Sequence, residues 1–503
     1  MAGRAKGFLM KKRFLFTGLI MMTLLVVAII FFLKHRQESE GGRNERCNLL
    51  LIVSDSLRWD ILGCYGGDAR TPNIDRLARE GALFEQAYTT APCTIPASIG
   101  IMTGNYSRVY AEQVFQMDDR PGQTIPYISS RETLFPEVLH RQGYDLRRSD
   151  ENRLISSSNI LQGFSPFAPV FRRQRERISK LLGKSEGNLP YNHAEVRLQQ
   201  MLYPLLSYLL TVPRDRNFMI FKWFTDPHFP YRPPRQFTNT IPRDTLKLTF
   251  PKEFYTTLNF KELEKISESG QLQEGDVAFF RYLYRGEVEW VDERVGYILK
   301  ALDKRGLRRN TLVVLTADHG ELLGENGGFG HGANFSPALI RVPLVFSGPG
   351  IPRGIKERTP VSHVDLVPTL RDLLSVDYKD DVMGRSYAPL FAGEKLGERP
   401  IYLDRDVNHL ENRNQGEALV MGDFILIRRQ GRGFLSLCNF RQDPWGLNNL
   451  VRKNPLMTAK MLKALKSLQN AIERRRRSPD SSGPVRGAKA REIRKNMEQL
   501  GYL

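Results

Sequence analysis

"CNLLLIVSDS", residues 47–56, is a continuous apolar run that ends in an acidic residue. Runs of this kind are typical of buried strands in a parallel sheet, where functional groups lie at the carboxyl end of each strand. The same pattern recurs in "RNFMIFKWFTDPH", residues 216–228, and in "NTLVVLTADHGE", residues 310–321. Each of the three segments therefore predicts a central strand that is followed by candidate ligand side chains.

Helical periodicity occupies the sequence between these strands, as in "TPNIDRLAREGALF", residues 71–84, and "EVEWVDERVGYILKALDKRG", residues 287–306. The alternation of strand and helix predicts an α/β fold with a mostly parallel central sheet flanked by helices. A chain of 503 residues can add a smaller C-terminal subdomain. We expect a catalytic domain over residues 47–400, followed by this subdomain and a basic tail over residues 401–503.

The net charge of +19 raises the question of nucleic-acid binding, but its distribution argues against it. Residues 47–450 contain 51 Lys and Arg against 48 Asp and Glu, so the excess lies in the two flanks. A basic groove in the core, and hence a nucleic-acid partner, is excluded on this ground. The four cysteines include no C-x-x-C pair, which argues against a disulfide framework and a zinc ribbon.

Residues 14–33 form a run of 20 residues without a charge. At about 1.5 Å per residue, a helix of this length matches a hydrocarbon core of roughly 30 Å. Basic residues precede the run, which predicts a cytoplasmic N-terminus at residues 1–13, a single transmembrane anchor, and a tether at residues 34–46. The catalytic domain is then expected outside the cytoplasm, in the periplasm or the extracellular space. A cleaved signal peptide is the alternative, although its apolar region is usually shorter.

Carboxylate and imidazole side chains gather at the three predicted strand ends. Each of them alone is weak evidence, because a strand-end Asp is as often a turn residue. Together they supply the side chains that a metal site needs. The mixture of carboxylate with imidazole suits zinc or manganese better than calcium, which takes oxygen ligands. The residues are Asp55, Asp226, His228, Asp318 and His319, with His331 in "GFGHGANF" added.

From about Asn48 to its end, the chain resembles the sulfatase branch of the alkaline phosphatase superfamily. The resemblance rests on ordered motifs, among them "NLLLIVSDSLRWDILGCYGG", "FTDPHFPYRPP", "TADHGELLGENGGFGHG", "VSHVDLVPTLRDLL" and "RQDPWGLNNL". It implies the alkaline-phosphatase/sulfatase-like fold, a bound divalent metal and an anionic ester substrate, with lipid-linked and glycan-linked esters as candidates. The oligomeric state stays open.

The nucleophile follows from the register of the "APCTIPASIGIMTG" segment. In sulfatases, a Cys of the pattern Cys-x-Pro-x-Arg is oxidised to formylglycine and stands nine residues before the Thr of a Thr-Gly pair. Here Thr103 fixes the frame, and nine residues earlier stands Thr94 rather than Cys93. Pro96 follows Thr94 at the expected spacing, and Ser98 replaces the Arg. The resemblance therefore implies Thr94 as the catalytic nucleophile and no formylglycine.

A threonine changes the chemistry that the site can perform. It cannot expel sulfate by collapsing to an aldehyde, but it can form a phosphothreonine that water or an alcohol resolves. The chain is in this respect similar to the Thr-nucleophile, membrane-anchored relatives, which include phosphoethanolamine transferases and lipoteichoic-acid synthases. We therefore expect a membrane-anchored, metal-dependent hydrolase or transferase that acts on phosphoesters. A sulfuric ester hydrolase and a catalytically silent surface protein are the alternatives.

The resemblance also implies a metal shell for one divalent ion, zinc or manganese. Its expected ligands are Asp55, Thr94, Asp318 and His319. Two departures from the family pattern affect this shell. Ser56 stands where sulfatases place a second acid, and His319 stands where many place Asn.

Three further residues are predicted to act on the substrate. His228 and His331 are expected to bind the non-bridging oxygens of the ester or to protonate the leaving group. The family often has Lys at the place of His331. Arg58, three residues past Asp55, is a candidate for substrate binding, with a structural ion pair as the equal alternative.

Overall fold

A computed structural model describes most of the chain after its N-terminal segment. By internal contacts the chain separates into a unit that ends at Arg46 and a unit over Cys47–Leu503, and the account below concerns the second unit. The described residues are 46–477 with gaps at 112, 117–123, 153–154, 156–157, 184–197, 239–245, 333, 379–381, 406–415, 430–432 and 444–445.

The core is an eight-stranded sheet in the order β14-β2-β13-β9-β1-β8-β6-β7. Strand β1 (Asn48–Ser54) lies between β8 (Phe218–Phe224) and β9 (Thr311–Ala317) and runs parallel to both. Only β13 joins antiparallel neighbours within this sheet, so the prediction of a mostly parallel sheet is confirmed. The other strands are β2 (Ala82–Phe84), β6 (Asp145–Asp150), β7 (Ser165–Pro166), β13 (Leu344–Ser347) and β14 (Ile355–Glu357).

The three central strands are the three apolar runs of the sequence. All seven residues of β1, of β8 and of β9 are buried. A strand that is covered on both faces has no solvent side, so its sequence reads as a continuous apolar run instead of alternating. The strand predictions are confirmed for this reason.

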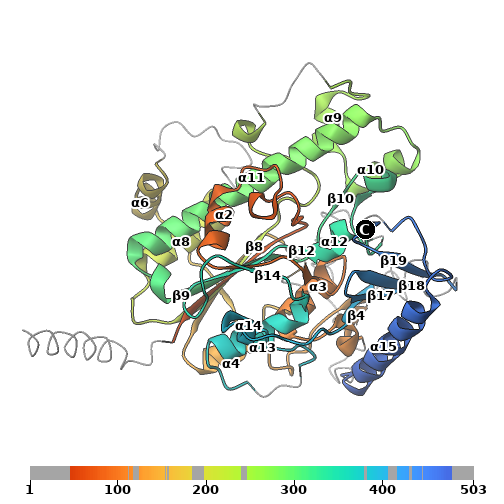
Figure 1. The fold of residues 1–503 in the computed structure, drawn as a ribbon. Coiled ribbons are helices and arrows are strands. Elements are labelled where there is room, and N and C mark those ends of the chain that lie inside the picture. Colours follow the sequence, from red (N-terminus) through yellow and green to blue (C-terminus); the bar gives the residue numbers. More distant parts are fainter. Residues whose placement is uncertain are drawn as a thin grey trace, which may run out of the picture. The chain divides into compact units, whose positions relative to one another are not determined.

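Helices cover both faces of the sheet (Figure 1). On one face lie α2 (Pro72–Arg79), α8 (Tyr203–Thr211) and α11 (Glu274–Arg305); on the other lie α3 (Thr94–Thr103), α4 (Phe135–Arg141) and α13 (Leu366–Leu373). The remaining helices are α6 (Arg172–Leu182), α9 (Lys252–Thr257), α10 (Phe260–Glu268), α12 (Pro337–Ile340) and α14 (Ala388–Phe391), with shorter turns η1 (Gly63–Tyr65), η2 (Ser107–Tyr110), η3 (Leu198–Leu202), η4 (Arg235–Phe237), η5 (Arg308–Asn310), η6 (Glu325–Gly327) and η7 (His363–Asp365).

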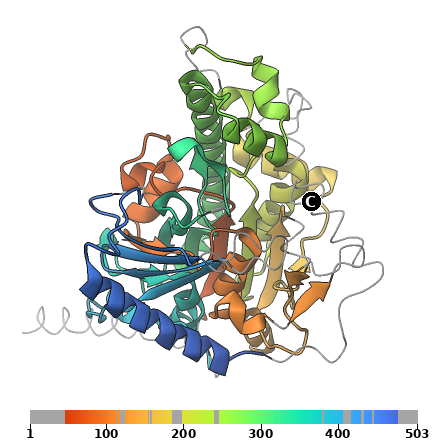
Figure 2. The ribbon, with the colours of Figure 1, turned by 90° about the vertical axis from the view of Figure 1, so that its right-hand side faces the viewer.

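The C-terminal part forms a second, smaller sheet, which confirms the predicted subdomain. Its four antiparallel strands are β16 (Ile401–Arg405), β17 (Gly416–Met421), β18 (Phe424–Arg429) and β19 (Leu435–Asn439). Helix α15 (Pro455–Arg474) packs across this sheet, in blue in Figure 2. The predicted boundary between residues 400 and 401 stays a prediction. Small two- and three-stranded sheets contain β3 (Ala87–Tyr88), β4 (Val114–Gln116), β5 (Thr124–Pro126), β10 (Leu322–Leu323), β11 (Phe329–Gly330), β12 (Arg341–Val342) and β15 (Val361–Ser362).

The predicted localisation, a single-pass membrane protein with an extracytoplasmic catalytic domain, needs correction. Within the part of the chain that the structure describes, no helix is both long enough and apolar enough to cross a membrane. The two longest described helices, α11 and α15, carry charged side chains along their length. The predicted anchor at residues 14–33, with the segments on either side of it up to residue 45, lies outside the described residues.

The turn that follows β9 depends on a glycine. Gly320 is buried, and its N–H donates to the carbonyl of Leu339 over 2.8 Å. A Cβ atom at this position would lie 1.8 Å from the carbonyl oxygen of Ala338, which is far inside van der Waals contact. Since the obstacle is backbone, the turn after β9 can pass here only with glycine.

We expect Gly320→Ala to lower the free energy of unfolding by about 3 kcal/mol, because the added methyl group overpacks a rigid backbone contact. Chemical denaturation of the purified protein measures this loss. Gly397→Ala is the matched control, since Gly397 is exposed and no atom lies within 4 Å of the added Cβ. Equal stability of both variants would contradict the close approach.

Candidate active site

Two carboxylates and one imidazole meet at the carboxyl ends of the central strands. Asp55 directly follows β1, and Asp318 and His319 directly follow β9. Because β1 and β9 are parallel neighbours, with Ser54 paired to Ala317, their next residues emerge side by side. One ligand atom from each of the three side chains lies within 4.8 Å of the others, and all three side chains are fully buried.

His319 is oriented as a metal ligand would be. Its Nδ1 lies 2.8 Å from the carbonyl oxygen of Gly320, so Nδ1 donates and Nε2 is left as an acceptor. Nε2 lies 3.2 Å from Oδ2 of Asp318 and 3.9 Å from Oδ1 of Asp55. Burial lowers the pKa of His319 to about 3, which keeps the ring neutral, the form that binds metals.

The two carboxylates are held in place by hydrogen bonds, yet their charge is not compensated. Oδ1 of Asp318 accepts from the backbone N–H groups of Ser56 (3.0 Å) and His319 (2.8 Å), while its buried Oδ2 has no hydrogen-bond partner among the described residues. Oδ2 of Asp55 accepts from Asn152 over 2.9 Å. Burial raises the pKa of both carboxyls to about 7, and each of these groups would ionise fully beside a cation. The donor set therefore fits a divalent metal ion.

The structure brings Thr94 to this cluster. Thr94 is the first residue of α3 and is buried, and its Oγ1 lies 3.3 Å from Nε2 of His319. Its neighbour Cys93 caps the helix in an extended conformation. Burial raises the pKa of the Cys93 thiol well above its usual range, and the charges of Arg405, Asp404 and Asp318 also act on it. The thiol is therefore a protonated, buried group.

Two further histidines pack against the cluster. The ring of His331 lies 4.3 Å from the ring of His319 and 4.9 Å from the ring of His228, centroid to centroid. Burial lowers the pKa of His331 well below its usual value. Burial also acts against a charge on His228, but the neighbouring carboxylates Asp55 and Glu321 outweigh it and raise the pKa of His228. One neutral and one readily protonated imidazole thus lie side by side.

Sequence reasoning missed two members of the site. Glu321 is fully buried, its Oε1 lies 3.0 Å from Nδ1 of His331, and burial raises the pKa of Glu321 to about 7, so a protonated Glu321 can donate to this nitrogen. The position of Glu321 directly after Asp318-His319-Gly320 could have identified it, because acidic residues at strand ends are candidate site residues. Asn152, the partner of Asp55, lies far from any recognised motif, and no sequence signal identifies it.

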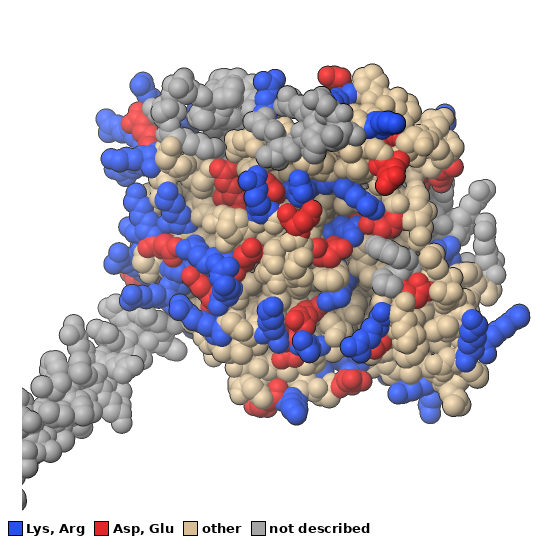
Figure 3. Space-filling model, turned by 45° about the horizontal axis from the view of Figure 1, so that its top comes forward, with Lys and Arg blue, Asp and Glu red and all other residues tan. Residues whose placement is uncertain are grey.

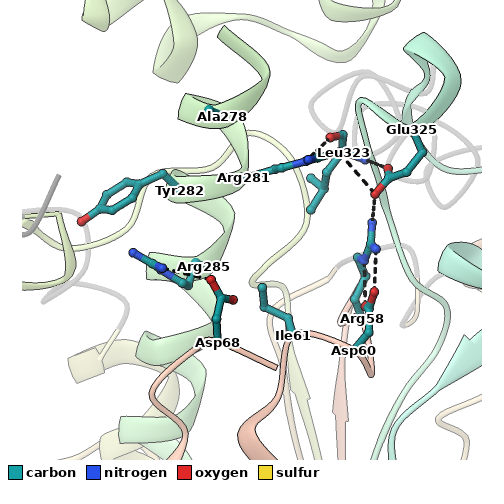
Figure 4. A pocket seen from close by; sticks show the side chains of 10 residues that line it. All are labelled: Arg58, Asp60, Ile61, Asp68, Ala278, Arg281, Tyr282, Arg285, Leu323 and Glu325. Carbon is teal, nitrogen blue, oxygen red and sulfur yellow. Dashed lines mark hydrogen bonds and ion pairs between the residues drawn. The ribbon is translucent and has the colours of Figure 1, made fainter. Parts of the chain in front are cut away.

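Arg58 lies at a separate cavity of about 510 Å³ between α11 and the loop after β1 (Figure 4). Its guanidinium forms ion pairs with Asp60 (2.8 Å) and Glu325 (2.6 Å) and also donates to the carbonyl of Glu321 over 3.1 Å. These partners occupy the donors that a substrate anion would need, so the geometry favours the structural ion pair. The substrate role of Arg58 stays a prediction.

A buried group of four charges lies behind His228. Arg294 of α11 pairs with Asp226, two residues before His228, and lies 3.5 Å from Glu151. Glu151 in turn pairs with Lys222 of β8 over 2.6 Å. Two cations thus balance two carboxylates, which fixes the loop that carries His228 against the sheet.

The fold and this cluster can now be compared with known proteins. The sulfatase family model matches residues 47–376. The chain belongs to the sulfatase family. Among curated sulfatases, the uncharacterized sulfatase YidJ of Escherichia coli (strain K12) is 25% identical over 367 residues, which span 68% of this chain and 70% of that protein. The choline-sulfatase of Rhizobium meliloti (strain 1021) is 28% identical over 358 residues, which span 66% of this chain and 68% of that protein.

Solved structures agree on the fold. The phosphonate monoester hydrolase of Agrobacterium radiobacter superposes with a TM-score of 0.67 at 21% identity, over 85% of this chain and 96% of that chain. A structure titled BT4656 in complex with D-glucosamine-2-N,6-O-disulfate has a TM-score of 0.65 at 19% identity, over 85% of this chain and 98% of that chain. The predicted family and α/β fold are confirmed, and the chain is a sulfatase-family hydrolase.

With its metal removed by chelation, this sulfatase should lose stability as the pH rises. Burial raises the pKa of Asp55 and of Asp318 to about 7 in the folded chain, against about 3.8 for an exposed Asp, so the folded state binds more protons between these pH values. Stability is then greatest below about pH 4 and falls as the pH approaches about 7. The lowered pKa of His319 and of His331 acts in the opposite direction, so thermal unfolding at about pH 5 and about pH 7.5 compares the chelated protein with its chelated Asp55→Asn variant. The carboxyl contribution should make the melting temperature of the variant fall less, or rise more, between the two pH values, and added zinc or manganese should remove the contribution from the unaltered protein. Equal changes in the two proteins would contradict the assignment.

His319→Ala should lose the bound metal, because only two carboxylates would then hold the cation at the site. We expect at least about a tenfold weaker metal affinity, measured by titration of the chelated protein with zinc. His140→Ala is the control, since His140 is exposed and outside the cluster. Stoichiometric metal in both His319→Ala and Asp318→Ala would show that the ion is held elsewhere.

Proposed function

We propose that this sulfatase-family chain is a metal-dependent hydrolase of phosphate-type esters in which Thr94 is the nucleophile. The observation that carries the proposal is the position of Thr94 Oγ1, 3.3 Å from Nε2 of His319, while Cys93 caps the helix with a buried, protonated thiol. A threonine ester of sulfate cannot be released by collapse to an aldehyde, whereas a phosphothreonine can be resolved by attack at phosphorus.

Asp55, Asp318 and His319 would hold the metal ion, with the Thr94 hydroxyl beside it. Zinc or manganese fits an imidazole ligand better than calcium, and no formylglycine is involved. When bound, the ion supplies Lewis acidity, which favours the ionised alkoxide of Thr94 and offsets the negative charge of the ester. The unsatisfied Oδ2 of Asp318 supports this assignment.

The remaining residues then act on the ester itself. After the hydroxyl proton of Thr94 has passed to solvent water, Oγ1 forms a bond to phosphorus as the bond from phosphorus to the leaving oxygen breaks. His228, whose pKa is raised, gives its proton to that oxygen. His331 is neutral, and when Glu321 is protonated and donates to its Nδ1, its Nε2–H donates to a non-bridging oxygen of the ester. Water, or an alcohol in a transfer reaction, next attacks phosphorus and regenerates the Thr94 hydroxyl.

A sulfuric ester hydrolase is the second candidate. It is favoured by the curated relatives, whose names include choline-sulfatase, iduronate 2-sulfatase and arylsulfatase. Against it stands the nucleophile segment, where Thr94 occupies the expected register. A third candidate, a protein that keeps the fold without activity, is opposed by the metal-ligand set, since Asp55, Asp318 and His319 are all in place.

The test compares Thr94→Ala with Cys93→Ser on aryl phosphodiester, phosphomonoester and sulfate substrates. Thr94→Ala removes the nucleophile and should lower kcat at least about a thousandfold while metal content is retained. Cys93→Ser is nearly isosteric and should change kcat less than about threefold. Thr94→Ser, which restores a hydroxyl, should recover part of the activity.

Quenching the wild-type reaction on a phosphodiester should place added phosphate mass on the peptide that contains Thr94. The peptide should also show Cys93 as an unmodified thiol. An aldehyde at Cys93, or an active Thr94→Ala beside an inactive Cys93→Ser, would reverse the assignment and favour the sulfuric ester hydrolase. Absence of turnover on all three substrates by metal-loaded wild-type protein would favour the silent protein.

A further inference from the structure

A second cavity, of about 410 Å³, is lined by residues of α6, α8 and the C-terminal end of α11. Helix α8 leads into the amino end of β8, and α11 leads into the amino end of β9. The metal ligands lie at the carboxyl ends of the central strands. A strand of seven residues spans about 23 Å, so this cavity is separate from the catalytic cluster.

The lining of this cavity is basic and contains no acid. The cavity at Arg58 differs in charge, because three arginines and three carboxylates line it. In Figure 3, Lys and Arg gather on the left-hand side, the side on which α6 and α8 lie in Figure 1. The residues that line the second cavity are Gln174, Arg177, Ile178, Lys180, Ser207, Leu210, Thr211, Lys304 and Arg305.

Three of the four cations are exposed and are free of ion pairs. Arg177, Lys180 and Lys304 have no carboxylate within ion-pair distance among the described residues, and each is open to solvent. The acids beside them in the sequence are engaged elsewhere. Glu176 pairs with Arg172 over 3.4 Å, and Asp303 pairs with Arg76 over 3.6 Å.

Two hydrogen-bonding groups at the cavity are engaged within the protein. Nη2 of Arg305 donates to the carbonyl of Val212 over 2.9 Å, and Thr211 donates its hydroxyl to the carbonyl of Ser207 over 2.8 Å. The exposed cations Arg177, Lys180 and Lys304 are therefore the main donors that a ligand would meet.

Helix capping accounts for only part of this charge. The C-terminal ends of α6, α8 and α11 lie at the cavity, and each contributes a partial charge of about −0.5. Three such ends amount to roughly −1.5, against four formal positive charges. The cavity therefore keeps a net positive potential after its helix ends are counted.

We propose that this cavity is a second binding site, which takes a sulfate or phosphate ester carried on a hydroxylated body such as a sugar. Arg177, Lys180, Lys304 and Arg305 would bind the oxyanion, for which charge-assisted hydrogen bonds are the strongest available. The hydroxyl and amide groups suit sugar hydroxyls, and Ile178 with Leu210 provides an apolar strip. A volume of about 410 Å³ falls in the range of small-molecule sites. At this distance from the metal ligands, the ligand is not the ester that reacts.

The test measures binding of a sulfated monosaccharide, its phosphorylated counterpart and the uncharged sugar to the full chain by calorimetry. Thr94→Ala is used as the background so that the probes are not consumed. We expect two binding events for each charged probe and none for the uncharged sugar at this cavity. Arg177→Gln, Lys180→Gln and Lys304→Gln together should weaken one event at least about tenfold and leave the other unchanged.

A triple variant on α15 is the matched control. Lys460→Gln, Lys463→Gln and Lys466→Gln remove the same three charges from exposed positions on a different element. Both binding events should survive in this control. Equal weakening in the two triple variants would show an effect of net charge alone and would overturn the proposal. Binding that the cavity variant leaves unchanged, or equal binding of the uncharged sugar, would also overturn it. A preference between the two charged probes identifies which ester the site selects.

Discussion

The pairing of β1 with β9 is the constraint on which the site depends. It brings the carboxylates of Asp55 and Asp318 close enough for one metal ion to contact both. Their separation is set by the register of two parallel strands and not by flexible loops. Burial raises the pKa of both carboxyls, and the nearby charge of Asp318 raises the pKa of Asp55 further. The protein holds them there with backbone donors and with one neutral imidazole. The arrangement is stable as a charged site only when a cation completes it.

The sequence was a good guide wherever the site is continuous with a strand. The apolar runs predict the three central strands because both of their faces are covered, and the ligands follow directly at the strand ends. Partners that arrive from remote segments were not predictable. Asn152 reaches Asp55 from a stretch without a pattern, and the ion pairs of Arg58 with Asp60 and Glu325 require the folded chain to be recognised. The predicted membrane localisation was wrong, because no helix among the described residues is long and apolar enough to cross a membrane. That prediction came from residues 14–33, which lie outside the described residues.

Membership of a family does not by itself identify the nucleophile. Relatives at 28% identity and below share the fold, and the fold brings one helix start, that of α3, to the metal ligands. Which side chain stands there depends on a single position along the helix. Cys93 is the extended N-cap and Thr94 is the first helical residue, and Oγ1 of Thr94 lies 3.3 Å from Nε2 of His319. Membership of the sulfatase family shows a hydrolase, whereas we propose the attacking group from the register within one short segment.

The order of the central strands has a consequence for biosynthesis. Strand β1 begins at Asn48, but its two neighbours begin at Phe218 and Thr311, so the central pairing joins segments far apart in the chain. Contacts of such high sequence separation form slowly and only after the distant segment has left the ribosome. Until residue 317 is available, β1 is an apolar strand with one open edge, a template for association with other chains. The pairing that brings Asp55 beside Asp318 and His319 thus leaves an apolar strand edge open during much of the protein's synthesis.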